Sequence, residues 1–332
     1  MTPVHVVAAP DKFKGTASAS VIAEAVCRAA AALGHRCDPV PMADGGDGFL
    51  EAFGGPNRVT TVTGPLGDPV DAAWRLDPAR AVIEMARASG LALVGGAEGN
   101  DAVAATTYGT GELIAAAVEA GATRVLVGVG GSATTDGGLG ALRALHPVQR
   151  LRSVELVVAC DVRTTFVDAA AVFAPQKGAT PAQVALLRRR LERLAQVYRH
   201  DYGVDVTTIP GSGAAGGLAG GLAAVGAELV PGFDLVAEEV RLDERMAGAD
   251  LVVTGEGFVD EESFHGKVVG GVLELAAVLR VPALVVAGEL FTPVPSPVTA
   301  ISLVERFGRE AALADPADCV QTAVGEWLAA RP

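Results

Sequence analysis

Short apolar segments alternate with longer amphipathic segments along most of the chain. Apolar runs bounded by turn residues predict buried strands at 4–9, 37–43, 124–129, 154–160, 250–254, 283–288 and 298–304. Helical periodicity predicts helices at about 17–33, 110–120, 182–198 and 267–279, with a further helix at the C-terminal end. In segment 182–198 the apolar residues Val184, Leu187, Leu191 and Leu194 share one face. We expect its arginines Arg188, Arg189, Arg190 and Arg193 to face solvent.

The middle of the chain has a different pattern. Between residues 59 and 86, the turn signals GPLGD and DPAR separate short β-like pieces, which predicts an antiparallel meander. Alternating strands and helices at both ends of the chain, around a β-richer middle, predict a discontinuous parallel-sheet α/β domain that holds an inserted α/β domain. We place the first domain at 1–57 and 232–332 and the second at 58–231.

Composition and charge exclude several functions. The net charge of −13 disfavours binding to nucleic acid or to an anionic membrane. The longest apolar stretch, at 214–227, is too short and too rich in glycine to span a bilayer. The cysteines Cys27, Cys37, Cys160 and Cys319 have no metal-ligand spacing, and the N-terminal residues show no signal-peptide pattern. We therefore expect free thiols and a cytoplasmic protein.

Lysine is used very selectively. Of the 26 basic residues only four are lysines, namely Lys12, Lys14, Lys177 and Lys267, and all of them lie within three residues of a glycine. Arginine and lysine differ in geometry and hydration, so this placement indicates sites that need a compact ammonium group. Lysine beside a glycine loop at a strand end is typical of phosphate binding. No P-loop motif is present.

Acidic residues recur in glycine-rich loops, several of them directly after predicted strands. They are Asp44 and Asp47 in ADGGDG, Asp136 in GGSATTDGG, Asp161 in ACD, and Glu256 and Asp260 in GEGFVD. Mg²⁺ is held by one or two carboxylates together with waters and substrate phosphates. These loops and the lysines together predict a Mg²⁺-phosphate site. We expect the glycines of GGSATTDGG to leave room for a phosphate group wrapped by backbone amides.

The same loops carry a family resemblance. The segments APDKFKGTASA, MADGGDG, EMARASGLALV, TTYGTGEL, VGGSATTDGG, AVFAPQKGAT and TGEGFVDEESFHGK resemble, in the same order, motifs of the two-domain type I bacterial glycerate kinases. The motifs run from residue 8 to residue 267. The resemblance implies phosphorylation of D-glycerate that depends on ATP and Mg²⁺. It also implies a flavodoxin-like domain beside the inserted, mixed-sheet domain.

The loops and the resemblance together assign candidate roles. We expect catalytic roles for Asp136, Lys267 and Lys14. We expect phosphate or ATP to be bound by Lys12, Lys14, Gly15, Gly130, Gly131, Ser132 and Lys177. We expect the substrate to be bound by Thr107, Thr110 and Arg87, and the metal by Asp44, Asp161, Glu256 and Asp260. The active site is expected in the cleft between the domains, His265 has a positioning role, and the oligomeric state stays open, with a homodimer as one option.

The chain also departs from the family pattern. Thr135 replaces a usual asparagine and Phe258 a usual arginine, while the loops at 140–154, 163–168 and 95–101 differ or are shortened. Arginine is a natural clamp for a substrate carboxylate, so these departures bear on the acceptor more than on phosphoryl transfer. Two alternatives therefore stand beside glycerate kinase. One is a kinase for another small hydroxy acid, and the other is a catalytically silent sensor of a phosphorylated acid.

Overall fold

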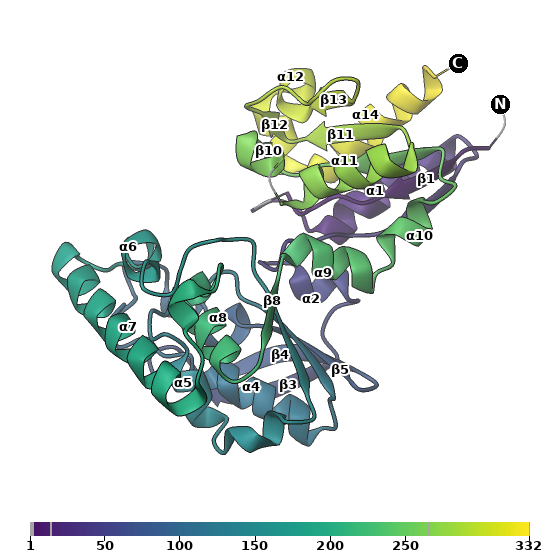
Figure 1. Ribbon diagram of the computed structural model, residues 1–332. Coiled ribbons are helices and arrows are strands. Elements are labelled where there is room, and N and C mark those ends of the chain that lie inside the picture. The colour runs from purple at the N-terminus through teal and green to yellow at the C-terminus, as the bar shows by residue number, and fades with distance from the viewer. Residues whose placement is uncertain (1–2, 14, 265, 332) are drawn as a thin grey trace. The chain divides into compact units, whose positions relative to one another are not determined.

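The chain folds into two compact units. The computed structural model describes residues 3–331 except residues 14 and 265. Unit 1 comprises Met1–Asp44, Glu51–Phe53 and Phe233–Pro332, and unit 2 comprises Gly45–Leu50 and Gly54–Gly232. Strands and helices alternate along both units, as Figure 1 shows.

Unit 1 is built on a five-stranded parallel sheet. Its strands are β1 (His5–Ala8), β2 (Arg36–Pro39), β9 (Leu251–Thr254), β11 (Ala283–Ala287) and β13 (Thr299–Ser302). They lie in the order β13-β11-β9-β1-β2, and every neighbouring pair is parallel. From β1 the chain passes outward to β2 on one side, while β9 lies on the other side of β1. The strand order therefore reverses between β1 and β9, as in a flavodoxin-like sheet.

Helices cover both faces of this sheet. In β11, Leu284 and Val286 pack on one side with α1 (Ala19–Ala32) and α14 (Pro316–Ala329), while Val285 and Ala287 pack on the other side with α11 (Val268–Leu279). This alternation follows from the two-residue period of a strand, and burial on both faces explains the continuous apolar runs in the sequence. The remaining elements of this unit are α9 (Gly232–Glu239), α10 (Leu242–Met246), α12 (Leu303–Phe307), α13 (Arg309–Ala314), a 3₁₀ helix at Glu261–Phe264 and the short parallel pair β10 (Phe258–Val259) and β12 (Glu289–Leu290).

Unit 2 is built on a six-stranded mixed sheet. Its strands, in spatial order, are β3 (Arg58–Thr63), β4 (Pro69–Asp77), β5 (Arg80–Glu84), β6 (Arg124–Gly128), β7 (Glu155–Ala159) and β8 (Glu228–Val230). The β3–β4 and β4–β5 pairs are antiparallel, which confirms the predicted meander, and the pairs from β5 to β8 are parallel. The loops after β5, β6 and β7 consequently emerge at the same edge of the sheet.

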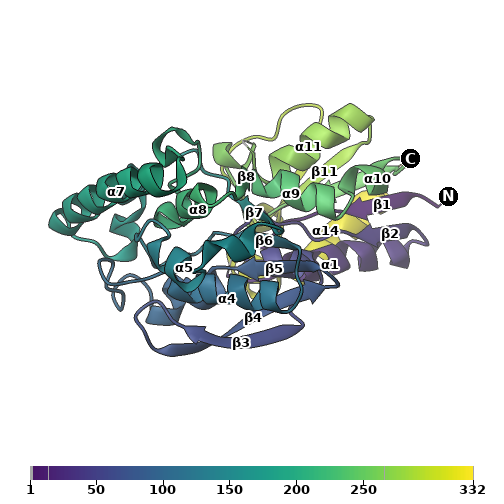
Figure 2. The same cartoon turned by 60° about the horizontal axis from the view of Figure 1, so that its bottom comes forward.

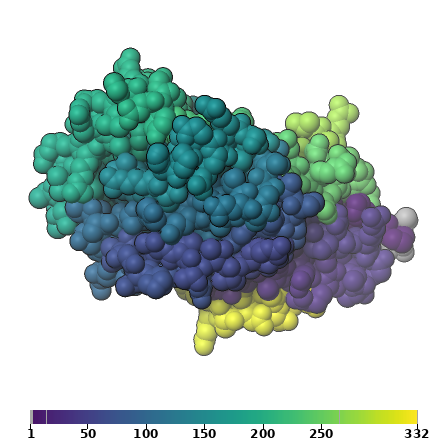
Figure 3. Space-filling view, turned by 90° about the horizontal axis from the view of Figure 1, so that it is seen from below, coloured from purple at the N-terminus to yellow at the C-terminus, as the bar shows by residue number. Residues whose placement is uncertain are grey.

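The helices of unit 2 pack on one face of its sheet, as Figure 2 shows from a second side. The longer ones are α4 (Tyr108–Glu119), α7 (Pro181–Tyr202) and α8 (Ala214–Ala224), and the shorter ones are α3 (Ala86–Ser89), α5 (Leu139–Ala144) and α6 (Ala169–Phe173). The short helix α2 (Phe49–Ala52) is divided between the two units and does not belong to this group. Four 3₁₀ helices lie at Leu91–Val94, Val148–Leu151, Pro175–Lys177 and Val206–Thr208. Helix α7 begins with a capping box formed by Thr180 and Gln183 and buries Leu187 and Leu191. Its arginines are exposed as predicted, and this helix contributes the green-teal surface at the left of Figure 3.

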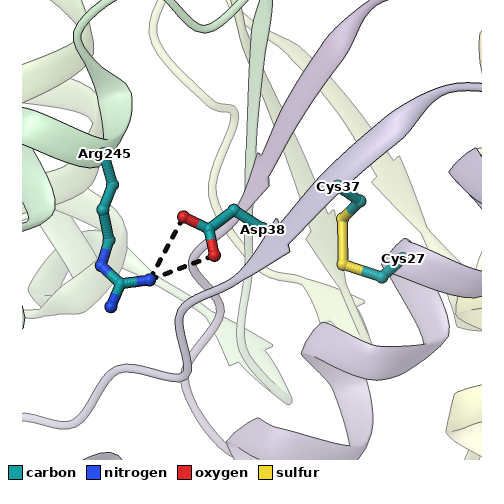
Figure 4. Close-up of a disulfide and its surroundings, with 4 residues drawn as sticks. All are labelled: Cys27, Cys37, Asp38 and Arg245. Carbon is teal, nitrogen blue, oxygen red and sulfur yellow. Dashed lines mark hydrogen bonds and ion pairs between the residues drawn. A yellow bond between two sulfur atoms is a disulfide. The ribbon is translucent and has the colours of Figure 1, made fainter.

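The prediction of four free thiols is wrong for one pair. Cys27 on α1 and Cys37 on β2 form a disulfide, beside the ion pair in which Arg245 Nη1 lies 3.1 Å from Asp38 Oδ1 (Figure 4). The helix α1 turns directly into β2, which brings the two Cα atoms to 5.1 Å, within the range that a disulfide bridges. Cys160 and Cys319 are free. Because disulfides are rare in reducing compartments, the cytoplasmic localisation loses this support and stays a prediction.

Among the described residues, no helix is both long and apolar enough to cross a membrane.

Candidate active site

Charged residues gather in unit 1 where the strand order reverses. Asp11 and Lys12 follow β1, and Glu256 follows β9, the neighbouring strand. The Asp11 amide donates to the Gly255 carbonyl at 2.8 Å, which joins the two loops. In open α/β sheets, ligands bind outside the carboxyl ends of the strands at this reversal point. We therefore take this charged group as a candidate site.

Lys12 lies between two carboxylates. Its Nζ is 3.7 Å from Asp11 Oδ1 and 3.9 Å from Asp44 Oδ1, where Asp44 ends the segment that follows β2. Burial raises the pKa of Asp11 to about 7, Asp44 and Glu256 push it in the same direction, and Lys12 opposes them. An ammonium group in this position offsets the repulsion among several carboxylates, and its loss would leave them uncompensated.

Glu256 and Lys267 also belong to the charged group of unit 1. Burial raises the pKa of Glu256, whereas a hydrogen bond from Ser263 and the charge of Lys267 lower it. Lys267 directly precedes α11, and its Nζ lies 3.5 Å from Glu262 Oε2. The Oε1 atom of Glu256 is buried and has no hydrogen-bond partner among the described residues. A buried carboxylate oxygen in this state is open to a ligand.

Of the four predicted metal ligands, Asp44, Glu256 and Asp260 belong to unit 1 and Asp161 belongs to unit 2. Asp260 Oδ1 accepts from the amides of Glu262 and Ser263, so it caps a 3₁₀ helix. Asp161 is in unit 2, where its Oδ1 accepts from the Gly232 amide at 2.8 Å. Within the described part of the chain, no three or more His, Cys, Asp or Glu side chains are arranged to hold a metal ion.

Mg²⁺ does not need such a cage, because waters and phosphate oxygens complete its shell. The Glu256 carboxylate, which has one buried oxygen without a partner among the described residues, and the nearby Asp44 carboxylate are hard oxygen ligands of the kind that Mg²⁺ takes. Asp11 was missed from the sequence as a site residue, although its position directly after a buried strand is the signal that could have found it.

In unit 2, the Asp136 carboxylate accepts hydrogen bonds from several chain segments. Its Oδ2 accepts from the amides of Thr107 and Gly140 at 2.9 and 3.1 Å, and its Oδ1 accepts from the Gly138 amide at 3.0 Å. The Thr107 hydroxyl lies 2.9 Å from Oδ2 and also donates toward the same carboxylate. The carboxylate thus ties the glycine loop to the starts of α4 and α5. The catalytic role predicted for Asp136 stays a prediction, and these contacts favour a structural role.

The glycines of GGSATTDGG are required by protein contacts. A Cβ on Gly130 would lie 2.5 Å from Gly46 Cα, and a Cβ on Gly138 would lie 3.1 Å from Gly221 Cα at a backbone φ of +79°. Backbone segments from ADGGDG and from α8 thus occupy the space where we expected a phosphate. The close approach of these segments accounts for Gly130 and Gly138, and the phosphate role predicted for Gly130 stays a prediction. Gly131, which is exposed and has a φ of +70°, keeps its predicted phosphate role as a prediction.

Lys177 also contacts the loop 130–138, through a buried hydrogen bond. Its side chain is buried, and its Nζ donates to the Thr134 carbonyl at 2.6 Å. Burial lowers the pKa of Lys177 to about 7, and the charge of Asp136 opposes this shift. Asn100 donates to the carbonyls of Ala133 and Lys177, which fastens the two segments together. Burial and this hydrogen bond favour an anchoring role for Lys177 over the predicted phosphate contact.

The predicted substrate-binding residues lie near the carboxyl edge of β5 and β6 but are engaged within the protein. Thr107 and Thr110 are fully buried, and the Thr110 hydroxyl donates to Ser89 Oγ at 2.8 Å. The guanidinium of Arg87 donates to Glu84 Oε2 at 2.8 Å, while Glu84 Oε1 accepts from the Leu50 amide. The geometry gives both threonines structural roles and leaves Arg87, which is half-buried, at the surface.

Ser132 is close by, since residues 90 and 132 form a β-bridge that joins the loops after β5 and β6. Gly15 has a φ of +80°, which suits glycine at a turn. Lys14 and His265 lie outside the described residues, so their predicted roles stay predictions.

Comparison with known proteins decides the family. The model of the glycerate kinase family matches residues 6–148 and 146–300. The chain belongs to the glycerate kinase family. The chain is 39% identical to glycerate 2-kinase of Escherichia coli K12, with 86% of each chain covered, and 39% identical to glycerate kinase of Bacillus subtilis 168, with 86% of this chain and 85% of the relative covered. A solved structure named as glycerate kinase 2, from Salmonella typhimurium LT2, superposes with a TM-score of 0.86 at 34% identity, over 99% of this chain and 98% of that one.

Membership of the glycerate kinase family makes the chain a kinase. It also confirms the fold class expected from the sequence, because the structural relative covers both units.

Proposed function

We propose that this protein transfers a phosphoryl group from ATP, with Mg²⁺, to D-glycerate. Family membership supports the reaction class. One observation carries the assignment to a site, namely that Lys12 lies between the carboxylates of Asp11 and Asp44 at the reversal point of the parallel sheet. Phosphoryl transfer relies on positioning and on stabilising charge, and this arrangement supplies both.

The residues of unit 1 suit the phosphoryl donor. Lys12 and Lys267 are compact cations that can neutralise phosphate oxygens, each restrained by a neighbouring carboxylate. Asp44 and Glu256 would hold Mg²⁺, which when bound neutralises charge on the phosphates of ATP. Burial raises the pKa of Asp11 to about 7, and the neighbouring carboxylates of Asp44 and Glu256 contribute in the same direction.

The loops of unit 2 suit the acceptor. Glycerate offers a carboxylate and two hydroxyls, so its recognition needs a cationic or amide donor for the carboxylate. Arg87 is held by Glu84 at the carboxyl edge of β5, and Ser132 lies in the bridged loop after β6. We propose these two residues as contacts for the acceptor carboxylate. Because the relative from Escherichia coli is named a 2-kinase, we propose the 2-hydroxyl as the acceptor atom.

A panel of acids tests this function. ADP formation is measured by a coupled assay with Mg²⁺, ATP and D-glycerate, with lactate and tartronate as comparison acids, and ³¹P NMR identifies the product. We expect turnover of D-glycerate and 2-phosphoglycerate as product. Turnover of another acid without turnover of D-glycerate would indicate a kinase for that hydroxy acid. No turnover of any acid would indicate the silent sensor.

A further inference from the structure

Successive peptide groups of the loop 130–138, which follows β6, are each fixed by a hydrogen bond. The Leu91 amide donates to the Gly131 carbonyl at 2.9 Å. The Ala133 amide donates to the Ser89 carbonyl at 3.0 Å. These two backbone contacts fix the peptide groups on both sides of Ser132. A peptide group is planar, so one hydrogen bond to it also sets the direction of its other polar atom.

Side chains fix the next two peptide groups of the loop. Asn100 Nδ2 donates to the Ala133 carbonyl at 3.0 Å, and Lys177 Nζ donates to the Thr134 carbonyl at 2.6 Å. Asn100 Nδ2 also donates to the Lys177 carbonyl at 2.8 Å. The side-chain amide of Asn100 therefore joins the loop 130–138 to the 3₁₀ helix Pro175–Lys177, whose last residue makes the second contact with the loop.

The segment that carries Asn100 is itself held on both sides. Gly178 follows the 3₁₀ helix, and a Cβ on it would lie 2.3 Å from the Ala97 carbonyl oxygen, so the two segments are in close contact. Asp101, the next residue after Asn100, accepts from the Val103 amide at 2.9 Å and closes a tight turn. The side chain at position 100 is therefore supported by its neighbours before and after it along the chain.

The contacts of Asn100 need an uncharged amide side chain. Its Nδ2 carries two N–H groups, one for each of the two carbonyls. An aspartate of the same size would place an acceptor oxygen against both carbonyls, and an alanine would remove both donors. Position 100 therefore allows an isosteric test of what the contact does.

We propose that Asn100 is a positioning residue for the acceptor, because it holds the loop 130–138 so that Ser132 contacts the carboxylate of the hydroxy acid. The inference rests on the proposed function, which assigns that contact to Ser132. Asn100 acts through the Ala133 peptide group and does not itself contact the substrate. A displacement of about 1 Å in a binding group is enough to weaken its contact with a ligand. Loss of Asn100 therefore weakens binding of the acid, and it leaves binding of the nucleotide, whose phosphates we assign to unit 1, unchanged.

Binding measurements on variants test the proposal. Titration calorimetry with D-glycerate and, separately, with ADP is carried out on the wild type, Asn100→Ala and Asn100→Asp. Asn57→Ala is the matched control in unit 2, because Asn57 also makes two hydrogen bonds to backbone atoms, those of Leu76 at 3.0 and 2.9 Å. Leu76 pairs with Ala81 at the beginning of β5, at the opposite edge of the sheet from the loop.

The expected result is specific to the acid. The Kd of D-glycerate should rise roughly tenfold in Asn100→Ala and further in Asn100→Asp, with the KM for glycerate rising in parallel and kcat changing less. The Kd of ADP should stay within about twofold of the wild type in every variant. Asn57→Ala should bind both ligands as the wild type does, although it also loses two hydrogen bonds.

Several results would overturn the proposal. An unchanged Kd of D-glycerate in both Asn100 variants would do so, as would equal weakening of D-glycerate and ADP, or equal weakening of D-glycerate in Asn57→Ala. If the wild type binds and phosphorylates another hydroxy acid instead, a rise in the Kd of that acid supports the positioning role, although the proposed substrate is wrong. Wild-type protein that binds no acid of the panel would overturn both the positioning role and the proposed function.

Discussion

The Thr107 amide and the Asp136 carboxylate lie 2.9 Å apart, and the Thr107 hydroxyl reaches the same carboxylate. This contact fixes the first turn of α4 against the loop after β6. It also places a negative charge beside a helix N-terminus, where the unpaired amides favour it. The loop 130–138 is thereby held to its helices at one point.

Replacing Asp136 tests whether this contact is structural. We expect Asp136→Asn to lower the free energy of unfolding by about 2–4 kcal/mol, because several charge-assisted hydrogen bonds are lost together. Urea titration gives the value. Asp71→Asn is the control, since Asp71 also accepts from a threonine hydroxyl but on the exposed meander, and we expect a change below about 0.5 kcal/mol. A variant at position 136 with wild-type stability and a reduced kcat would instead support the catalytic role.

The buried ammonium of Lys177 should make stability depend on pH. Its pKa is lowered to about 7 in the folded protein, so between pH 7 and about 10 the unfolded chain binds one proton more than the folded chain. Stability therefore rises with pH across this window, and the cost of burying the charge is fully present only below about pH 7. Lys177→Met removes this term. We expect the wild type to gain about 2 kcal/mol relative to the variant between pH 7 and pH 8.5.

Urea titrations of both proteins at a series of pH values measure this difference. Parallel stability curves for the two proteins would show that the Lys177 pKa is not lowered.

The disulfide predicts a definite thiol count. Unfolded protein without reductant should show two reactive thiols, from Cys160 and Cys319, and four after reduction. The free energy of unfolding of the Cys27→Ser, Cys37→Ser double variant should be about 2–3 kcal/mol lower than that of the oxidised wild type. The reason is that the disulfide restrains the short segment between α1 and β2 in the unfolded chain. Four thiols in the protein as purified under air would contradict the pairing.

The sequence predicted the fold better than it predicted the contacts. Apolar runs located β1, β6 and β11 because strands buried on both faces must be apolar throughout. It missed β8, α9 and α10, which are short and half-exposed, so their periodicity is weak. The disulfide was not predicted, because the spacing of Cys27 and Cys37 does not show that α1 is followed at once by β2 and packs beside it.

The sequence predicted the residue types of the candidate site but not the contacts that these residues make. Glycine loops with lysines and acids correctly marked Lys12 and Asp44 as neighbours in space. The sequence of these loops does not show which of their side chains are buried. Lys177 and Thr107 have the residue types of ligand contacts, yet they are buried inside unit 2, where tertiary packing decides their partners. The sequence also does not show that Asp11 is buried, and burial is the main cause of its raised pKa.

The rate of the Lys12→Met variant tests the central claim most directly. Steady-state kinetics with Mg²⁺, ATP and D-glycerate should show kcat/KM at least about 100-fold below the wild type, since a preorganised cation at the transferring phosphate is lost. Lys12→Arg should not restore the rate, because the planar guanidinium does not replace a compact ammonium. Arg188→Met, an exposed cation on α7, is the control and should keep full activity. Near-wild-type kcat/KM in folded Lys12→Met would contradict the assignment of phosphoryl transfer to this site.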